Sequence, residues 1–540
     1  MLKSLLVQNL RSFHEEFEFE IKPITILLGR NSSGKSSITR LIPLYRQSFE
    51  QRTSAPILWN GNLVDFGSVA DVRPRNHESV DIGLGFELSI DSQDDWWFRR
   101  RYIFPRQPRI DFSEPIKYKV GLTDVGDDDA DYRRTRLCRV ELTTNGDSLK
   151  LSLDEEGGIN SCTINGLSFK DDVAKNETRF DVQSFFPAMR SKMQRVVTSS
   201  SSAAFDYLDE EKLKIISPMC HGSTNEDTRK DIAHHIPYTS RGRFPDFLRK
   251  SGIGTEFFRN KVKEYQGFGV QDVERLRLLA LLSALPQIIS VVGEIASAEF
   301  LLSSYIGPMR AAGERYYRWQ ELAVDRLDPK GENFAMYMMS LSPPEQIRFS
   351  ELLSKHFGYT ILAKRESGHA SLMLSDVGSS EYFNIADVGF GFSQILPVIA
   401  QIHAAQRRPA WQRARLAPNT IPISSSIFAV EQPELHLHPA FQGKIADLLC
   451  ASTGMAGSKV EVPSREPPPI ERNRRFIVET HSEALVNRFG ELVATGQLKE
   501  TDIVIYIFEK GDASSETRVR RADFNAGGEL KNWPYGFFNY

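Results

Sequence analysis

The segment Pro23–Ser37 reads PITILLGRNSSGKSS, an apolar stretch that runs into Gly29-x-x-x-x-Gly34-Lys35-Ser36. The apolar residues predict a strand, and the following SSITRLIPLYRQSF predicts a helix. Two glycines let a backbone curl closely around an anion, with consecutive N–H groups directed inward at the positive end of the helix. The segment therefore predicts a phosphate-binding loop.

The chemistry of the loop residues suggests a role for each of them. Lys35 is expected to reach the β- and γ-phosphates of ATP, and Ser36 is expected to hold Mg²⁺. The remaining nucleotide contacts are expected from Gly29, Asn31, Ser32, Ser33, Gly34 and Ser37.

Length and composition fit one large soluble protein. With 540 residues and 41% hydrophobic content, the chain can bury a substantial core, and its length predicts roughly three domains or lobes. Its net charge of −3 argues against a general attraction to DNA, so nucleic acid would have to contact local basic stretches. These stretches are Arg99–Arg101, Arg133–Arg136 and Arg407–Arg415. The four cysteines show no CxxC spacing, and the N-terminus lacks a signal peptide's apolar core, which suggests the reducing cytosol.

The most apolar run is Leu278–Gly293. Pro286 interrupts it and Glu294 follows it, and it is shorter than the roughly 20 residues that span a bilayer. It predicts a buried or dimer-facing helix, and no membrane contact is expected.

The patterning predicts four divisions of the chain. Residues 1–75 read as the first lobe of an ATPase head, and 76–182 alternate as an antiparallel β insert, with Asn145-Gly146 as a hairpin turn. Residues 183–345 have helical periodicity, and 346–540 alternate strands and helices as the second lobe. The predicted fold class is α/β: an ABC-type P-loop ATPase head split by an antiparallel β insert and a helical insert.

A second anion-binding helix start is predicted at Asp387-Val-Gly-Phe-Gly391-Phe-Ser393-Gln394. Glycines ahead of a serine at a helix N-terminus are the means by which a signature motif contacts the γ-phosphate. Gly391, Ser393 and Gln394 are therefore expected to bind nucleotide. Such a serine does not easily reach the phosphate loop of its own chain, so it would complete the site of another subunit in a homodimer or higher oligomer.

The acidic strand Ser426–Glu434, SIFAVEQPE, should supply the catalytic carboxylates. Glu431 is expected on the Mg²⁺ side, and Glu434 is expected to orient or activate water. Gln432 leaves an alternative open, because many related ATPases have a glutamate directly after the first acid. Either Glu434 supplies the base, or the protein is a slow switch.

A third motif, Phe476–Glu483 (FIVETHSE), predicts a strand that ends near His481. This histidine is expected to donate to the γ-phosphate and to sense its presence. Arg310 has two open readings, a nucleotide contact or a packed interface, since aromatic and basic residues surround it.

Together, GRNSSGKSS, VGFGFSQILPVI, AVEQPELHLHP and VETHSE resemble the AAA-type ATPases of the OLD, RecF and SMC group. They more closely resemble a bacterial subfamily with EQPELHLHP, a "YIGPLR" segment (here YIGPMR, 305–310) and an ending similar to ELKNWPYGFF (529–538). The segment after His481 is too short for the Toprim nuclease of OLD proteins, so no such domain is expected in it.

This resemblance implies a function. Relatives of this kind, including Septu-type, retron-associated and PARIS ATPases, are ATP-controlled sensors or scaffolds in antiviral (anti-phage) defence, and they work with a separate nuclease or toxin effector. We therefore expect a cytoplasmic, oligomeric ATPase with ATP and Mg²⁺ as cofactors. The alternative is a DNA-repair or DNA-end-processing ATPase that clamps nucleic acid.

Overall fold

The structure is a computed structural model. It describes residues 1–74, 80–90, 110–125, 134–174, 178–190, 207–250, 252–264, 270–318, 320–321, 323–366, 368–406, 425–454, 473–510 and 516–533. The basic stretches at 99–101 and 407–415, and residues 534–538 of the C-terminal motif, lie outside these ranges.

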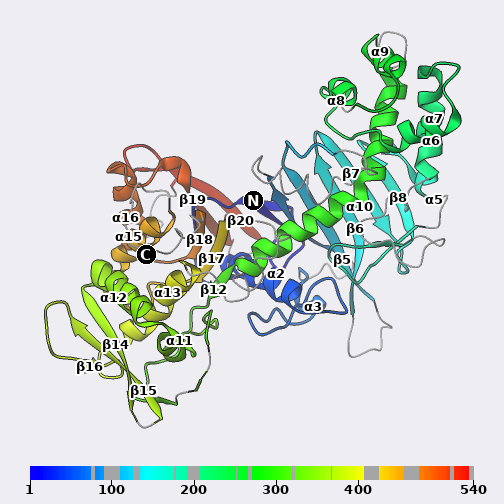
Figure 1. Ribbon diagram of the computed structural model, residues 1–540. Coiled ribbons are helices and arrows are strands. Elements are labelled where there is room, and N and C mark those ends of the chain that lie inside the picture. The colour runs from blue at the N-terminus through cyan, green and yellow to red at the C-terminus, as the bar shows by residue number, and fades with distance from the viewer. Residues whose placement is uncertain are drawn as a thin grey trace.

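A mainly parallel sheet carries the phosphate loop (Figure 1). Its strands follow the order β12-β17-β18-β3-β19-β20-β21, and β12 to β19 in that order run parallel. Its central strands are apolar and buried on both faces, as in parallel sheets covered by helices. The strands are β12 (Ser304–Ile306), β17 (Ser425–Glu431), β18 (Asn473–Glu479), β3 (Ile24–Gly29), β19 (Ile503–Lys510), β20 (Thr517–Phe524) and β21 (Leu530–Lys531).

Strand β3 comes from the start of the chain but lies between β18 and β19, which come from its last fifth. The ends of β3, β17 and β18 meet at one edge of the sheet, where Glu431 is paired in register with Glu479. The expected α/β P-loop fold is confirmed: strands from the two ends of the chain form one sheet.

The two faces of this sheet belong to different hydrophobic clusters. Leu27 joins the cluster that contains α2 and α10, whereas its neighbours Ile26 and Leu28 join the cluster that contains α13, α15 and α16. Successive side chains of a strand point to opposite faces, so one strand connects both cores. The helices around the sheet are α1 (Lys35–Thr39), α2 (Leu41–Glu50), α3 (Val69–Val72), α11 (Phe334–Ser340), α12 (Pro343–Phe357), α13 (Phe390–Gln406), α15 (Pro439–Ser452) and α16 (Glu483–Ala494).

A second, antiparallel sheet lies beside the parallel sheet (Figure 1). Its strands follow the order β2-β1-β4-β5-β6-β7-β8-β9. The predicted hairpin turn between β6 and β7 is confirmed: Asn145 (φ 53°) and Gly146 (φ 79°) both have the positive φ that such a turn requires. The strands are β1 (Leu2–Gln8), β2 (Phe17–Glu20), β4 (Ile82–Leu88), β5 (Ile116–Val125), β6 (Arg134–Thr144), β7 (Asp147–Leu153), β8 (Ile159–Ile164) and β9 (Leu167–Ser168).

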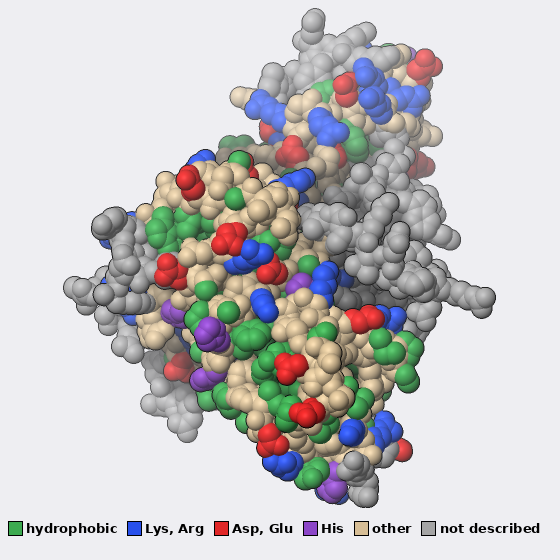
Figure 2. All heavy atoms as spheres, turned by 90° about the vertical axis from the view of Figure 1, so that its left-hand side faces the viewer, with side chains coloured by type: hydrophobic (Ala, Val, Ile, Leu, Met, Phe, Trp, Pro, Cys, Tyr) green, Lys and Arg blue, Asp and Glu red, His purple; other side chains and the backbone are tan. Residues whose placement is uncertain are grey.

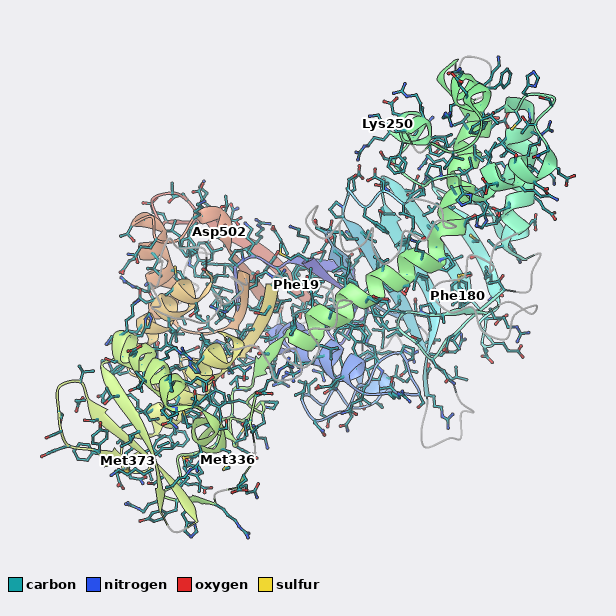
Figure 3. All side chains as sticks on the ribbon, in the orientation of Figure 1. Phe19, Phe180, Lys250, Met336, Met373 and Asp502 are labelled. Carbon is teal, nitrogen blue, oxygen red and sulfur yellow. The ribbon has the colours of Figure 1, made fainter. Side chains whose placement is uncertain are left out.

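Aromatic side chains join the two sheets. Phe17 and Phe19 of β2 each meet Tyr506 of β19 edge to face, with ring centroids 5.9 and 6.3 Å apart. Figure 3 labels Phe19 at this junction, Lys250 at the helical tip and Met373 at the opposite end of the molecule.

The other elements are α5 (Lys170–Ala174), α6 (Tyr207–Ile216), α7 (Glu226–His234), α8 (Phe244–Lys250), α9 (Glu256–Glu264), β10 (Arg179–Phe180), β11 (Met189–Arg190), β13 (Tyr317–Arg318), β14 (Tyr359–Glu366), β15 (His369–Asp376) and β16 (Phe383–Asn384).

Helix α10 (Val270–Leu302) runs from the tip formed by α6 to α9, along the antiparallel sheet, to the parallel sheet (Figure 1). It continues through Pro286 and past Glu294, which were expected to interrupt and end the apolar run. Among the described residues, only its stretch Gln271–Leu302 has the length and mean hydropathy (1.9) of a membrane span, and 72% of the most apolar window is buried inside the protein. We therefore describe α10 as a core helix.

The expected division boundaries remain predictions, but two pairings bear on them. Strand β1, within residues 1–75, pairs with β4 of the expected β insert, so both belong to one sheet. Strand β12, within the expected helical insert 183–345, pairs with β17 in the parallel sheet. A three-residue strand is too short for periodicity to reveal it in the sequence.

Candidate nucleotide-binding site

The phosphate loop follows β3 and closes tightly at both glycines. A Cβ on Gly29 (φ 152°) would lie 2.4 Å from the Phe508 carbonyl oxygen, and one on Gly34 (φ 98°) would lie 3.0 Å from Phe13 and Ser12. Ser32 also has a positive φ of 60°. Only glycine fits these two positions, so the loop keeps the close curve that an anion-binding cradle needs.

Lys35 begins α1 and is buried. Its Nζ donates to the carbonyl oxygens of Gly29 (2.9 Å) and Arg30 (2.8 Å) at the start of the loop. Burial lowers the pKa of Lys35, and the nearby carboxylates of Glu479 and Glu431 oppose this shift. The lysine therefore lies inside the loop and close to the acidic edge of the sheet.

Glu479 is the carboxylate that contacts the loop directly. The Ser36 hydroxyl donates to its Oε1 at 2.9 Å, and the Thr39 hydroxyl donates to its Oε2 at 3.3 Å. Burial, and then the charge of Glu431, raise the pKa of Glu479 to about 7. The sequence reasoning missed this residue, although its place as the acid of the VETHSE motif was a signal.

Glu431, expected on the Mg²⁺ side, has other partners. Arg40 donates to both of its carboxylate oxygens, from Nε at 2.7 Å and from Nη2 at 2.9 Å. The Tyr305 hydroxyl donates to Oε1 at 2.7 Å. The structure therefore places Glu431 between an arginine and a tyrosine, and Glu479 beside Ser36.

Glu434 and His481 lie together beyond the acidic strand. The backbone N–H of His481 donates to Glu434 Oε1 at 2.8 Å, and burial raises the pKa of Glu434. Among the described residues, neither Glu434 Oε2 nor His481 Nε2 has a hydrogen-bond partner, although both atoms are buried. Burial, and then Lys35, lower the pKa of His481, which favours the neutral imidazole.

Arg310 links the acidic strand to the signature motif. Its Nη2 donates to the backbone carbonyls of Glu431 (2.7 Å) and Gln432 (3.3 Å), and Gln394 Nε2 donates to the Arg310 carbonyl at 3.2 Å. Burial lowers the pKa of Arg310 to about 10. Of the two open readings, a packed position matches these backbone contacts.

The signature residues lie at the start of α13. Ser393 is buried (5% exposed), and its hydroxyl donates to the Phe390 carbonyl at 2.7 Å. A Cβ on Gly391 would lie 2.8 Å from the His436 carbonyl oxygen, so this glycine lets α13 approach the loop after β17. Phe390 is 51% exposed, so the aromatic residue of the motif, rather than the serine, is the one most open to solvent.

The remaining loop residues have different surroundings. Asn31 and Ser32 are exposed, and Ser33 is buried with no partner for its hydroxyl among the described residues. Ser37 accepts a hydrogen bond from Arg11 Nη1 at 3.3 Å.

The site fits a nucleotide and its metal ion by two observations. The tight loop and the unpartnered polar atoms of Ser33 and His481 are suited to donate to a polar anion, and the unpartnered Glu434 oxygen can accept a hydrogen bond from water. The hydroxyl of Ser36 and the carboxylate of Glu479 are the hard oxygen ligands that Mg²⁺ prefers. Ser36 and Glu479 are therefore the residues that could hold the metal ion.

Comparison with known proteins gives one family match. Residues 303–487 match the family model described as "AAA domain, putative AbiEii toxin, Type IV TA system". This segment runs from β12 through the signature motif and the acidic strand to His481. A search of curated proteins finds no match.

Solved structures of SMC heads are similar to the chain. The Smc head of Pyrococcus furiosus, bound to the C-terminal domain of ScpA, gives a TM-score of 0.34 at 12% identity, over 97% of this chain and 96% of that one. The SMC head domain from Thermotoga maritima gives 0.32 at 9% identity, over 96% and 98%. The sheet order and the phosphate loop themselves establish that the chain has an α/β P-loop fold.

Proposed function

We propose that the chain binds ATP with Mg²⁺ in the loop at residues 29–36 and hydrolyses it. The observation that carries this proposal is the group of buried polar atoms with no partner in the described part of the chain, Glu434 Oε2 and His481 Nε2. Lys35 lies close to both residues: after burial, its charge also lowers the pKa of His481, and the charge of Glu434 opposes the lowering of the Lys35 pKa by burial. Buried polar atoms in native proteins normally have partners, so this cluster is suited to a polar ligand.

The residues divide the work of hydrolysis. Lys35 can exchange the Gly29 and Arg30 carbonyls for phosphate oxygens, and His481 Nε2 can donate to the γ-phosphate. The raised pKa of Glu434 makes it a stronger base for the attacking water than an exposed glutamate. Mg²⁺ would neutralise charge on the phosphates. Gln432 cannot act as a base, so turnover depends on Glu434.

The test is ATP hydrolysis by the purified full chain and by Lys35→Ala. We expect repeated turnovers by the wild type and a loss of about 10²–10³-fold in Lys35→Ala, because one cation at the phosphates is removed. Lys22→Ala is the control, since Lys22 precedes β3 at the other end of the strand. A wild type that releases no more than one phosphate per chain would contradict hydrolysis and favour a non-hydrolysing switch.

We further propose that ATP joins two or more copies and that the assembly regulates a separate effector, a nuclease or toxin, in anti-phage defence. Among the described residues, the exposed large hydrophobic side chains concentrate between Met309 (80% exposed) and Phe390, near the signature motif and on the β14–β16 sheet. Figure 2 shows such side chains gathered over the lower part of one face. Patches of this kind often mark protein contacts.

The alternative, a nucleic-acid clamp, rests on basic stretches that mostly lie outside the described residues. It predicts binding to duplex DNA that weakens by several decades between low and moderate salt. Absence of such binding in the ATP-bound full chain would leave the effector-linked role.

A further inference from the structure

Two carboxylates end neighbouring strands at the phosphate loop. Glu431 on β17 and Glu479 on β18 are paired in register, so their side chains emerge on the same face. Both are almost fully buried. Two adjacent buried carboxylates repel each other, so each needs a partner that compensates its charge.

The partners of the two carboxylates differ in charge. Glu431 receives the forked guanidinium of Arg40 on both oxygens, and this geometry neutralises it. Glu479 receives only the hydroxyls of Ser36 and Thr39, and no ion pair to it occurs among the described residues. Lys35 acts on Glu479 only through its nearby charge, because its Nζ donates to the loop carbonyls. A buried carboxylate without an ion-paired cation is costly, so the position beside Glu479 favours a further positive ion.

The Ser36 hydroxyl adds a second hard oxygen at this position. Ser36 is the loop residue expected to hold Mg²⁺, and it is hydrogen-bonded to Glu479 and not to Glu431. Mg²⁺ binds through one or two carboxylates, a few waters and the phosphates of its nucleotide. Glu431 cannot serve there without giving up Arg40 and Tyr305.

We propose that Glu479 is the carboxylate that holds the Mg²⁺ of ATP, directly or through one water, and that Glu431 is a positioning residue for the loop. This inference rests on the proposed ATP binding. Arg40 directly follows α1, so the Arg40–Glu431 pair fixes the first helix after the loop against β17.

The test is the effect of Mg²⁺ on ATP affinity, measured by titration calorimetry with the full chain in Mg²⁺ and in EDTA. We expect Glu479→Gln to lose roughly 10–100-fold of the Mg²⁺-dependent gain in affinity and to keep the wild-type affinity in EDTA. Glu431→Gln is the matched control and should keep most of the gain. Bound Mn²⁺, counted by electron paramagnetic resonance with ATP, gives a second readout, and Glu479→Gln should lose it.

The outcomes separate this inference from the proposed function. If the wild type does not bind ATP, the proposed function fails and this inference fails with it. If the wild type shows the Mg²⁺-dependent gain and Glu479→Gln shows the same gain, only the assignment of Glu479 is overturned. If Glu431→Gln loses the Mg²⁺-dependent gain in ATP affinity and Glu479→Gln keeps it, Glu431 is the carboxylate that holds Mg²⁺. Should Glu479→Gln not fold, Glu479→Asp, which keeps the charge but shortens its reach, should bind Mn²⁺ more weakly than wild type.

Discussion

At the scale of single residues, the two neighbouring carboxylates should respond to neutralisation in opposite ways. Glu431→Gln leaves the buried side of Arg40 without its anion, so we expect unfolding free energy to fall by about 2 kcal/mol, less than for a fully buried pair because Arg40 is 31% exposed. Glu479→Gln removes a buried carboxylate that has no ion pair among the described residues and that the charge of Glu431 opposes, so it should raise stability. Denaturant unfolding without nucleotide at pH 8 measures both.

Glu431→Ala with Arg40→Ala provides the control for this comparison. If Arg40 and Glu431 form a compensating pair, the double variant should be less destabilised than the sum of the two single variants. A Glu479→Gln protein that is less stable than Glu431→Gln would contradict the described difference in their partners.

Glu434 and His481 lead to a second prediction for single residues. Glu434→Gln keeps the shape of the side chain but removes the base, so hydrolysis should fall by about 10²–10⁴-fold. ATP should remain bound, because Lys35 and the loop are unchanged. Single-turnover phosphate release together with ATP affinity measures both effects, and unchanged hydrolysis would assign the base elsewhere.

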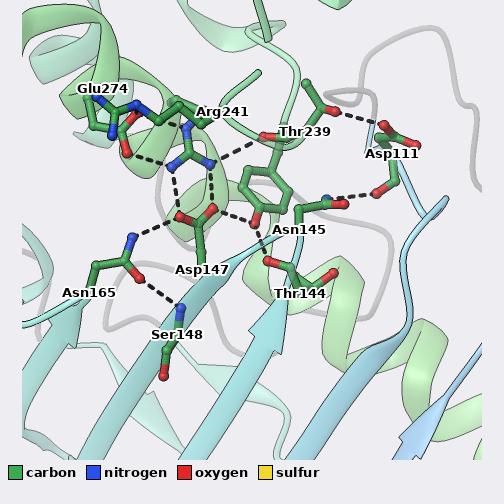
Figure 4. Close-up of polar contacts among 11 residues, drawn as sticks. Asp111, Thr144, Asn145, Asp147, Ser148, Asn165, Thr239, Arg241 and Glu274 are labelled. Atoms are coloured by element: carbon green, nitrogen blue, oxygen red, sulfur yellow. Dashed lines mark hydrogen bonds and ion pairs between the residues drawn. The ribbon is translucent and has the colours of Figure 1, made fainter. Parts of the chain in front are cut away.

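At the scale of elements, a buried ion pair fastens α10 to the β6–β7 hairpin (Figure 4). Arg277 donates to both Asp147 oxygens, with Nη2 at 2.7 Å from Oδ1, and also to Glu274 at 2.6 Å. The Tyr238 hydroxyl also donates to Asp147, at 2.8 Å. The pair holds the N-terminal part of α10 against the end of the antiparallel sheet.

Arg277→Ala should therefore cost about 3–5 kcal/mol of unfolding free energy, because it leaves Asp147 buried without a cation. Arg275→Ala on the same helix is the control: Arg275 is 44% exposed and makes a single contact with Asp172, so its loss should cost clearly less than the loss of Arg277. Urea unfolding measures both variants. An equal fall in unfolding free energy would show that the buried Arg277–Asp147 pair adds no more stability than the exposed pair.

The helical tip should loosen in acid. Burial alone would raise the pKa of Asp209, but its hydrogen bond with His234 and the charge of Lys212 outweigh burial and lower it. A carboxylate whose folded pKa is depressed contributes stability above its unfolded pKa, and loses it as pH falls through the folded pKa. The protection of the α6 and α7 amides from hydrogen exchange, relative to their intrinsic rates at each pH, should therefore fall below about pH 4. In Asp209→Asn this extra pH dependence should be absent, and its persistence would assign it to another group.

At the scale of the whole molecule, the proposed shared site predicts complementation between inactive variants. Lys35→Ala and Ser393→Ala should each be inactive alone. A hybrid dimer holds one intact pair, Lys35 from one copy and Ser393 from the other, so an equal mixture should recover about a quarter of the wild-type rate. ATP hydrolysis by purified variants, alone and mixed, measures this. No recovery would contradict a site shared between copies.

Much of the site could be predicted from short stretches of sequence. Gly29 and Gly34 reveal the loop because a side chain at either position would clash, and apolar strands that end in acids mark the edge of the sheet. The partners of the acids could not be predicted. Ser36 and Glu479 are 443 residues apart, and Arg40 and Glu431 are 391 apart, so no local pattern pairs them.

The path of α10 shows the same limit for an element. Pro286 lowers local helix propensity, yet the helix continues because its apolar residues are buried against both sheets, and burial outweighs one missing hydrogen bond. Likewise, β12 is too short to recognise, and only its pairing with β17 places it in the parallel sheet.

Neighbouring residues are enough to predict the phosphate loop, the order of the motifs and the α/β class, because each depends on backbone conformations and apolar periods within short segments. The contacts of Glu479 with Ser36, and of Glu431 with Arg40 and Tyr305, depend instead on how the folded chain packs. Parallel strand pairing brings distant carboxylates into register, and the side chains that the fold places around each one decide which of them forms an ion pair.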